Sequence, residues 1–205
     1  MNRSNIIFGK NITIEKDVEI GYGTDRETVI GDNCILRKGT IIYAGARLGN
    51  NVQTGHNTLI REDNIIGDNV RIGSYTELAP RNTIGTNTRI HTGCFLEDTT
   101  IGNNVFIGPH VLFTNDPHPS RPQHKNCFKG AIVEDHAIIG GGVTILPHII
   151  IGTCAFIGAG SVVTKDIPSN SVAVGNPAKI IKQLNTISCD KNGNQHNPYE
   201  EYPTR

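Results

Sequence analysis

The sequence has few aromatic residues and no excess of either charge. Phe, Tyr and Trp make up 5% of its 205 residues, and Trp is absent. This supply of rings is sparse for the core of an ordinary β-sandwich or α/β domain. Lys and Arg total 19, as do Asp and Glu, so the formal net charge is zero. Without a basic excess or a basic run, we expect no nucleic-acid partner and no membrane partner.

Long apolar segments and paired cysteines are also missing. No window approaches the roughly 18 consecutive apolar residues that a membrane-spanning helix needs, and the N-terminal residues do not resemble a signal peptide. The five cysteines form no C-x-x-C pair. We interpret them as reduced thiols rather than as a disulfide framework. We therefore expect a single-domain cytoplasmic protein.

The chain does contain an internal repeat of six residues. An aliphatic residue occupies every sixth position from Ile30 to Leu96, with Thr54 as the single exception. The register resumes at Ile101 after one missing residue, and it returns at Val133 after a non-repeating stretch. An α-helix requires apolar spacings of three and four, and an isolated strand requires two, so a spacing of six fits neither.

A period of six is typical of short strands joined by tight corners. Three such strands close one triangular coil, and stacked coils pair each strand with its equivalents above and below in parallel sheets. Gly and Asn at the corners, in runs such as G-D-N and G-N-N, supply the positive φ values that the turns require. The sequence therefore predicts an all-β fold, a left-handed parallel β-helix of hexapeptide repeats.

We expect this coil to occupy residues 1–184, with one long loop at 114–132. Residues 178–184, A-K-I-I-K-Q-L, have helical spacing, so we predict a short capping helix at about 176–184 that protects the last strand from further pairing. The polar residues 185–205 predict a tail that is either flexible or packed on a neighbouring subunit.

The stretch between Phe113 and Val133 interrupts the repeat with three prolines, two histidines and an arginine. Proline removes donors of the sheet ladder, so the coil cannot continue through it. An ordinary surface loop is one interpretation. A purely structural β-helix should be nearly uninterrupted, however, so a single polar excursion favours a functional loop.

Two C-terminal runs, I-G-A-G-S-V-V-T-K-D-I-P at 157–168 and V-G-N-P-A-K at 174–179, carry a resemblance to a known family. Together with the repeats and the loop, they resemble the hexapeptide-repeat acyltransferases over roughly residues 10–184. The resemblance implies an enzyme that uses acetyl-CoA or another acyl-CoA. It also implies a homotrimer with active sites between subunits, each loop reaching across to an adjacent chain.

Two branches of this family compete for the acceptor. G-P-H-V at 108–111 and F-T-N-D at 113–116 resemble the enzymes that acylate the amino group of nucleotide-linked amino sugars, the precursors of surface polysaccharides and glycans. His118-Pro119, however, matches the His-Pro of galactoside and maltose O-acetyltransferases, where many N-acyltransferases carry an aromatic residue. N-acylation is our first interpretation, and O-acetylation of a sugar hydroxyl is the alternative.

Acyl transfer requires a group that removes the acceptor's proton and donors that stabilise the developing oxyanion. His118 is the leading base candidate because an imidazole titrates near neutral pH. Glu97, which lies 18 residues and thus about one coil before Asn115, could accept a hydrogen bond from the amine or orient His118. Asn115 could orient the thioester or the amine. We take these three as candidate catalytic residues.

Further candidates follow from coil position and from the family comparison. The substrate-binding candidates are His91, His110 and Asp116, although Asp116 could simply shape the turn. The CoA-binding candidates implied by the resemblance are Gly141, Ala159, Thr164, Lys165, Lys179 and Lys182. Small residues let the pantetheine arm approach the backbone, and an amide near Gly141 could bind the oxyanion. Lysines can meet phosphates as point charges.

A zinc site is a further alternative, because some hexapeptide β-helices are zinc carbonic anhydrases. His91, His110, His118 and His124 lack the histidine spacing of that family, and the C-terminal runs resemble the CoA enzymes instead. We therefore expect no metal.

Overall fold

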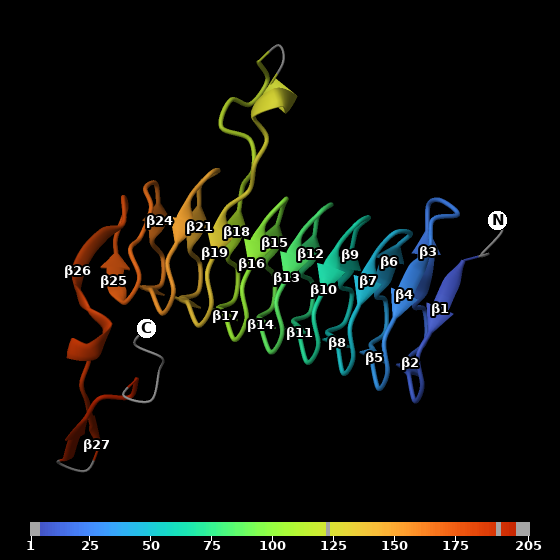
Figure 1. The fold of residues 1–205 in the computed structure, drawn as a ribbon, viewed down its shortest axis with the longest axis horizontal. Coiled ribbons are helices and arrows are strands. Elements are labelled where there is room, and N and C mark those ends of the chain that lie inside the picture. The colour runs from blue at the N-terminus through green and yellow to red at the C-terminus, as the bar shows by residue number, and fades with distance from the viewer. Residues whose placement is uncertain (1–4, 122–123, 192–193, 200–205) are drawn as a thin grey trace.

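The computed structural model describes residues 5–121, 124–191 and 194–199 of the chain. Three short strands per turn build three sheets, here called A, B and C, which run side by side along one coil (Figure 1). Every pair within the coil is parallel, apart from the last pair of sheet B. The predicted left-handed β-helix of hexapeptide repeats is confirmed.

The strands have the following bounds. Sheet A contains β1 (Ile6–Phe8), β4 (Thr28–Ile30), β7 (Arg47–Leu48), β10 (Ile65–Ile66), β13 (Thr83–Ile84), β16 (Thr100–Ile101), β19 (Ile132–Val133) and β22 (Ile150–Ile151). Sheet B contains β2 (Thr13–Ile14), β5 (Ile35–Leu36), β8 (Gln53–Thr54), β11 (Arg71–Ile72), β14 (Arg89–Ile90), β17 (Phe106–Ile107), β20 (Ile138–Ile139), β23 (Phe156–Ile157), β25 (Ser171–Val174) and β26 (Lys179–Gln183). Sheet C contains β3 (Glu19–Tyr22), β6 (Ile41–Tyr43), β9 (Leu59–Ile60), β12 (Glu77–Leu78), β15 (Phe95–Leu96), β18 (Leu112–Phe113), β21 (Thr144–Ile145) and β24 (Val162–Val163). Outside the coil lie β27 (Cys189–Lys191), β28 (Asn194–His196) and the 3-10 helices η1 (His124–Cys127) and η2 (Leu184–Thr186).

The core consists of the aliphatic residues that recur at every sixth position. Leu36, Ile84 and Ile139 are each at most 1% exposed, and each ends a two-residue strand. Thr54, the exception in the repeat, is equally buried, and its hydroxyl hydrogen-bonds that of Thr40 at 2.8 Å. A polar residue is therefore tolerated in the core because its hydroxyl has a partner.

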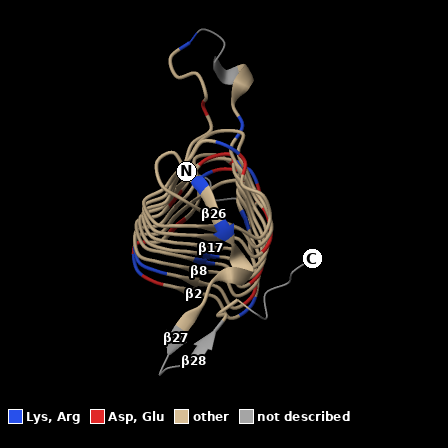
Figure 2. Ribbon diagram, turned by 90° about the vertical axis from the view of Figure 1, so that its left-hand side faces the viewer, with Lys and Arg blue, Asp and Glu red and all other residues tan. Residues whose placement is uncertain are grey.

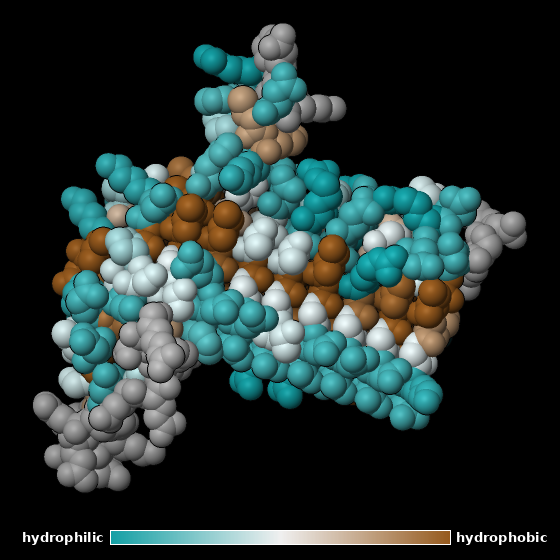
Figure 3. All heavy atoms as spheres, in the orientation of Figure 1, coloured by the Kyte–Doolittle hydropathy of each residue, from teal (hydrophilic) through white to brown (hydrophobic). Residues whose placement is uncertain are grey.

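On the outer surface of the coil, apolar and hydrophilic residues form separate rows. Figure 3 shows a band of apolar residues along the coil, with hydrophilic rows on either side. On sheet A, the outward residues Ile65 and Ile150 are 53% and 40% exposed. In the part of the chain described here, no helix is long and apolar enough to cross a membrane.

The predicted loop leaves sheet C after β18, returns to sheet A at β19, and stands away from the coil (Figures 1 and 2). Its base is closed by Lys129, whose backbone N–H donates to the carbonyl of Asn115 at 3.0 Å. Gly130 lies directly on the preceding coil, because a Cβ there would stand 2.5 Å from the carbonyl oxygen of Glu97. The loop is therefore seated on the coil that carries Glu97.

The predicted capping helix at 176–184 is wrong. Residues Lys179–Gln183 form β26, which pairs antiparallel with β25, and only the short η2 follows. All five side chains of β26 are exposed, so no apolar helix face is buried. Ile180 and Ile181 are β-branched and favour a strand, and β25 offers unpaired backbone groups. The strand β26 performs the capping role that the spacing predicts for a helix.

The described part of the predicted tail packs on the chain's own last coil. Leu184 is 4% exposed and clusters with Cys154 and Val172, while Ile187 and Tyr199 cover this cluster. The following β27 and β28 form an antiparallel pair.

Candidate functional site

The predicted site residues divide between two edges of the coil, and both edges border sheet C. The edge between sheets C and A, here called the loop edge, consists of corner residues 61–64, 79–82, 97–99, 114–131, 146–149 and 164–166. The edge between sheets B and C, here called the glycine edge, consists of corner residues 73–75, 91–93, 108–110, 140–142 and 158–160. The chain crosses from His91 to Glu97 over a distance of up to about 20 Å.

This division separates the candidate base from two of the expected CoA contacts, Gly141 and Ala159. The loop edge carries Glu97, Asn115, Asp116, His118, Thr164 and Lys165. The glycine edge carries His91, His110, Gly141 and Ala159. Lys179 and Lys182 lie exposed on β26, at the end of sheet B. Within one chain, the structure brings Asn115 beside Glu97 but leaves the loop-edge and glycine-edge residues on opposite sides of sheet C.

On the loop edge, Asn115 lies beside Glu97, as their spacing of one coil predicts. Asn115 is 3% exposed, and its amide nitrogen has no hydrogen-bond partner of good geometry within the described residues. It still lies close enough to act on the Glu97 carboxylate. Burial raises the pKa of Glu97, and the nearby Arg81 and Asn115 side chains only partly offset this effect. A buried amide donor beside a carboxyl of raised pKa is typical of a polar binding site.

His118 lies farther out on the loop. Its backbone N–H donates to Oδ1 of Asp116 at 2.8 Å, and its carbonyl accepts from the N–H of Arg121 at 3.3 Å. Asp116 therefore shapes the turn that presents His118. The imidazole is exposed and has no hydrogen-bond partner in the ranges that the structure describes.

A second imidazole anchors the loop, and the sequence reasoning did not single it out. Nε2 of His148 lies 2.9 Å from the carbonyl oxygen of Cys127, and its backbone N–H donates to Lys129 at 3.2 Å. His148 follows the strand β21 on the same edge as the loop. The only sequence signal was its place in the corner after a repeat, which is shared by many exposed residues.

The glycine edge is almost free of side chains along its C-terminal half. Nothing lies within 4 Å of the positions that a Cβ would take at Gly142 and Gly160, where φ is +67° and +71°. His110 lies over Gly93, since a Cβ there would stand 2.5 Å from its Nδ1. The ring of His91 packs against Phe106, with 4.9 Å between centroids. The backbone beyond the two histidines is open to a ligand.

The same edge also leaves backbone donors without acceptors. At the corners between sheets A and B, a side chain of the next coil often accepts the amide N–H: Asp68 accepts from Asn50 and Asp135 from Asn103, each at 2.7 Å. At Gly141 the following coil offers only Ala159, which has no such oxygen. Four corner amides of the glycine edge have no acceptor among the residues described: those of Ser74, Thr92, Gly141 and Ala159.

The remaining candidate groups are the cysteines, any metal ligands, and the pair Thr164 and Lys165. All five cysteines are free thiols. The residues described contain no group of three or more His, Cys, Asp and Glu side chains placed to share a metal ion. Thr164 and Lys165 are exposed in the last corner of the loop edge, on the side of sheet C opposite to Gly141.

Comparisons with known proteins agree with this architecture. Residues 27–62 match the bacterial transferase hexapeptide (six repeats), and residues 130–165 match the hexapeptide repeat of succinyl-transferase. These two matches support the hexapeptide-repeat transferase resemblance on both sides of the loop.

Individual relatives cover only part of the chain. A galactoside O-acetyltransferase of Lactococcus lactis is 39% identical over 43% of this chain and 44% of its own length. The galactoside O-acetyltransferase of Escherichia coli is 42% identical over 42% of this chain and 44% of its own length. The chain thus spans less than half the length of these curated relatives. The UDP-N-acetylglucosamine acyltransferase of Campylobacter jejuni shares the fold, with a TM-score of 0.61 and 21% identity over 84% of this chain and 75% of that one.

Proposed function

We propose that this protein is an acyl-CoA-dependent acyltransferase that acylates the amino group of a nucleotide-linked amino sugar. The observation that carries the proposal is the glycine edge, where Gly141 and Ala159 present backbone donors without acceptors on a surface almost free of side chains. The hexapeptide transferase matches and the acetyltransferase relatives support the same reaction class.

The glycine edge is suited to binding acyl-CoA, the acyl donor. The pantetheine arm of CoA is extended and carries amide carbonyls, which can accept from the exposed corner amides. The thioester oxygen gains negative charge as the acceptor attacks, and the N–H of Gly141 is a donor suited to it. Lys179 and Lys182 lie on β26, the last strand of sheet B, beyond the strand β23 that precedes Ala159. There they can meet the CoA phosphates.

A complete site requires a second subunit. His118 and the glycine-edge contacts of CoA, Gly141 and Ala159, lie on opposite sides of sheet C, so one chain cannot place them together. In a homotrimer, the loop edge of one subunit lies beside the glycine edge of the next, and the loop brings His118 to the neighbour's thioester. The exposed Ile65 and Ile150 on sheet A are apolar side chains that subunit contact would cover.

In this arrangement the neutral amine attacks the thioester carbonyl, a C–N bond forms, and the C–S bond breaks. His118 takes the proton that the amine loses. The CoA thiol has an ordinary pKa of about 8.5, so the thiolate leaves readily. Glu97 accepts a hydrogen bond from the acceptor amine, and the unpaired amide of Asn115 donates to the acceptor. Five free cysteines are typical of a cytoplasmic setting for this reaction.

O-acetylation of a sugar hydroxyl is the second candidate, and two observations favour it: His118-Pro119 and the galactoside O-acetyltransferase relatives. A hydroxyl depends on a well-oriented base, and no side chain in the described structure fixes the His118 ring. An amine is already nucleophilic when neutral. The free imidazole, together with a carboxyl placed to hold an amine, therefore favours the amino sugar.

The test is release of the CoA thiol from acetyl-CoA in the presence of nucleotide-linked amino sugars, free amino sugars, galactosides and maltose. We expect turnover with nucleotide-linked amino sugars and little with the plain sugars. Turnover of galactosides or maltose, with all amino sugars inert, would replace N-acylation with O-acetylation. No thiol release with any member of the panel would contradict the proposed reaction.

A further inference from the structure

A groove of about 430 Å³ lies on the outer face of sheet B, beside the N-terminal half of the glycine edge. Its floor includes the outward residues of three neighbouring strands, β8, β11 and β14. Its polar lining consists of Arg37, Gln53, His56, Arg71, Ser74, Arg89, His91 and Thr92. No carboxylate lines it. The proposed reaction leaves this concentration of positive charge without a role.

Two of its arginines stand next to each other. Arg71 and Arg89 are in register on the parallel strands β11 and β14, which places their backbones about 4.8 Å apart. Both are exposed, and neither has an ion-pair partner among the residues described. Like charges directly opposite each other in a sheet destabilise it, so an anion between them would relieve this repulsion.

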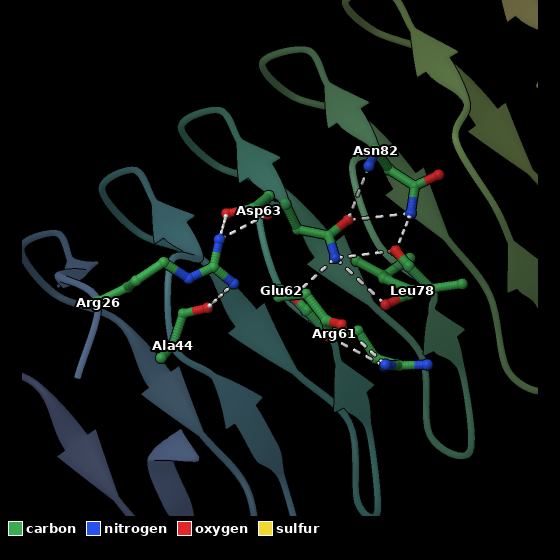
Figure 4. Close-up of polar contacts among 9 residues, drawn as sticks. Arg26, Ala44, Arg61, Glu62, Asp63, Leu78 and Asn82 are labelled. Atoms are coloured by element: carbon green, nitrogen blue, oxygen red, sulfur yellow. Dashed lines mark hydrogen bonds and ion pairs between the residues drawn. The ribbon is translucent and has the colours of Figure 1, made fainter. Parts of the chain in front are cut away.

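Arginines elsewhere on the coil are neutralised by the chain itself. Arg26 contacts Asp63 at 2.6 Å and Arg61 contacts Glu62 at 2.8 Å. Both pairs are drawn in Figure 4. Arg47 on sheet A likewise pairs with Glu27 at 2.7 Å. The absence of such a partner therefore distinguishes Arg71 and Arg89 from these other arginines of the described coil.

The groove also contains uncharged donors. The corner amides of Ser74 and Thr92, which line it, have no acceptor in the described parts of the chain. The side chain of Arg37 is held by donation to the carbonyl of Thr54 at 2.9 Å. Planar guanidinium groups combined with free backbone N–H groups form a donor set suited to phosphate oxygens.

The position of the groove indicates which substrate it serves. Arg89 belongs to the coil of β14, and Gly141 follows β20, two strand spacings farther along sheet B. This separation is about 10 Å, a distance that one sugar ring with its amino group can bridge. His91 and His110 occupy the corners between these two points. A ligand whose phosphates lie at Arg71 and Arg89 thus extends its sugar towards the thioester.

We propose that this groove binds the diphosphate of the nucleotide-linked acceptor, with Arg71 and Arg89 as its principal contacts. The inference rests on the proposed function, because it assigns the groove to the acceptor rather than to CoA. Arg71 and Arg89 are then specificity-determining residues, which make the enzyme select a nucleotide-linked sugar over the free sugar.

Calorimetric titration with uridine diphosphate and with inorganic pyrophosphate tests the groove without any reaction. We expect Arg71→Gln and Arg89→Gln each to raise the dissociation constant at least about tenfold, as expected for loss of a charge-assisted contact. Arg47→Gln is the matched control, because it removes an exposed strand arginine on sheet A. It should leave binding unchanged, and saturating CoA should not displace either probe.

Three outcomes would overturn the inference: no binding by the wild-type protein, equal weakening by Arg47→Gln, or displacement of the probes by CoA. Displacement would assign the groove to the donor's own diphosphate. The thiol-release assay separates this failure from that of the proposed function. Full turnover of a nucleotide-linked amino sugar by the Arg71→Gln, Arg89→Gln double variant would contradict diphosphate binding in the groove but support the proposed function. Binding of the probes that depends on Arg71 and Arg89 and is unaffected by CoA, without any acyl transfer, would support the groove's role but contradict the proposed function.

Discussion

The loop edge and the glycine edge are built by the same six-residue period, yet their corners are filled by different side chains. On the loop edge, Asn64 and Asn82 are fully buried, and both side-chain amides donate to the carbonyl of Ala79. Asn82 in turn accepts from the N–H of Thr99 at 2.9 Å. On the glycine edge, the amides of Gly141 and Ala159 have no acceptor in the described structure.

This difference shows how a repetitive fold acquires a site. The aliphatic position of each repeat builds the core and is nearly the same throughout. The corner residues contribute little to that core, so they can vary from one edge to another. Corners filled by hydrogen-bonded polar side chains stabilise the coil, and corners of glycine and alanine leave the backbone open to a ligand.

The largest effect should come from the base carried by the loop. We expect His118→Ala to lower kcat by about 10²–10⁴-fold at pH 7, with little change in the KM for acetyl-CoA. Raising the pH should partly restore the rate with an amine acceptor, because the neutral nucleophile then forms without a side-chain base. Steady-state kinetics against pH measures both effects. A nearly wild-type variant at pH 7 would remove His118 from the reaction.

The next effect comes from making the glycine edge resemble the corners between sheets A and B. In Ala159→Asp, the new carboxylate can accept the N–H of Gly141, as Asp68 accepts that of Asn50. We expect turnover of acetyl-CoA to fall about 10²–10³-fold, the usual effect of losing one oxyanion donor, without a lower Tm. Thr86→Asp, which adds the same charge at an A–B corner, is the control. Full activity of Ala159→Asp would contradict the role of this edge.

Mixing the two variants tests whether the edges act together across subunits. Trimers reassembled from equal amounts of His118→Ala and Ala159→Asp chains should contain an intact loop beside an intact glycine edge at about a quarter of their interfaces. Activity should therefore recover to about that fraction of wild type. Reassembled mixtures as inactive as either parent, with trimers present by sedimentation, would place the whole site within one chain.

A smaller effect on activity is expected from Glu97→Gln, together with an increase in Tm whose size depends on pH. Loss of its hydrogen bond to the amine should reduce kcat/KM for the acceptor about tenfold. The pKa of Glu97 is raised in the folded protein, so its ionisation opposes folding. That cost is absent below the unfolded-state pKa and fully present above the folded one. Glu97→Gln should therefore raise Tm at pH 7 relative to wild type, and less so at pH 4.

Glu77→Gln is the matched control for this variant, because Glu77 is a half-buried carboxylate one coil earlier on β12. It should leave acceptor turnover unchanged. An unaltered kcat/KM in Glu97→Gln, or equal losses in both variants, would contradict the assignment of Glu97 to the acceptor.

Most of the fold could be predicted because one property, burial of every sixth residue, specifies it. From Ile30 to Val163 the repeat marks the core residues and places the corners between them. The C-terminal segment could not be predicted in the same way. Ile180 and Ile181 lie in a short run whose spacing is compatible with helix or strand, and its pairing with β25 depends on a partner outside the run.

The site was only partly predictable, for a different reason. The spacing of Glu97 and Asn115 indicated one shared corner column, and the structure has them side by side. The separation of His118 from Gly141 depends on which of the three edges each corner occupies. The residue missing from the repeat after Leu96 makes that assignment difficult from the sequence. The groove was missed because Arg71 and Arg89 take the ordinary outward position before a core isoleucine, and their lack of carboxylate partners is visible only in three dimensions.

The constant height of each coil has a consequence for substrate length. Arg89 in the groove and Gly141 on the glycine edge are held apart by whole coils, each adding about 4.8 Å. The distance between them can therefore change only in discrete steps, by gain or loss of a complete turn. One additional turn between β14 and β17 would suit an acceptor longer by about one sugar, while the chemistry at both ends stayed the same. In a protein of this kind, the number of turns itself encodes the size of the molecule that fits.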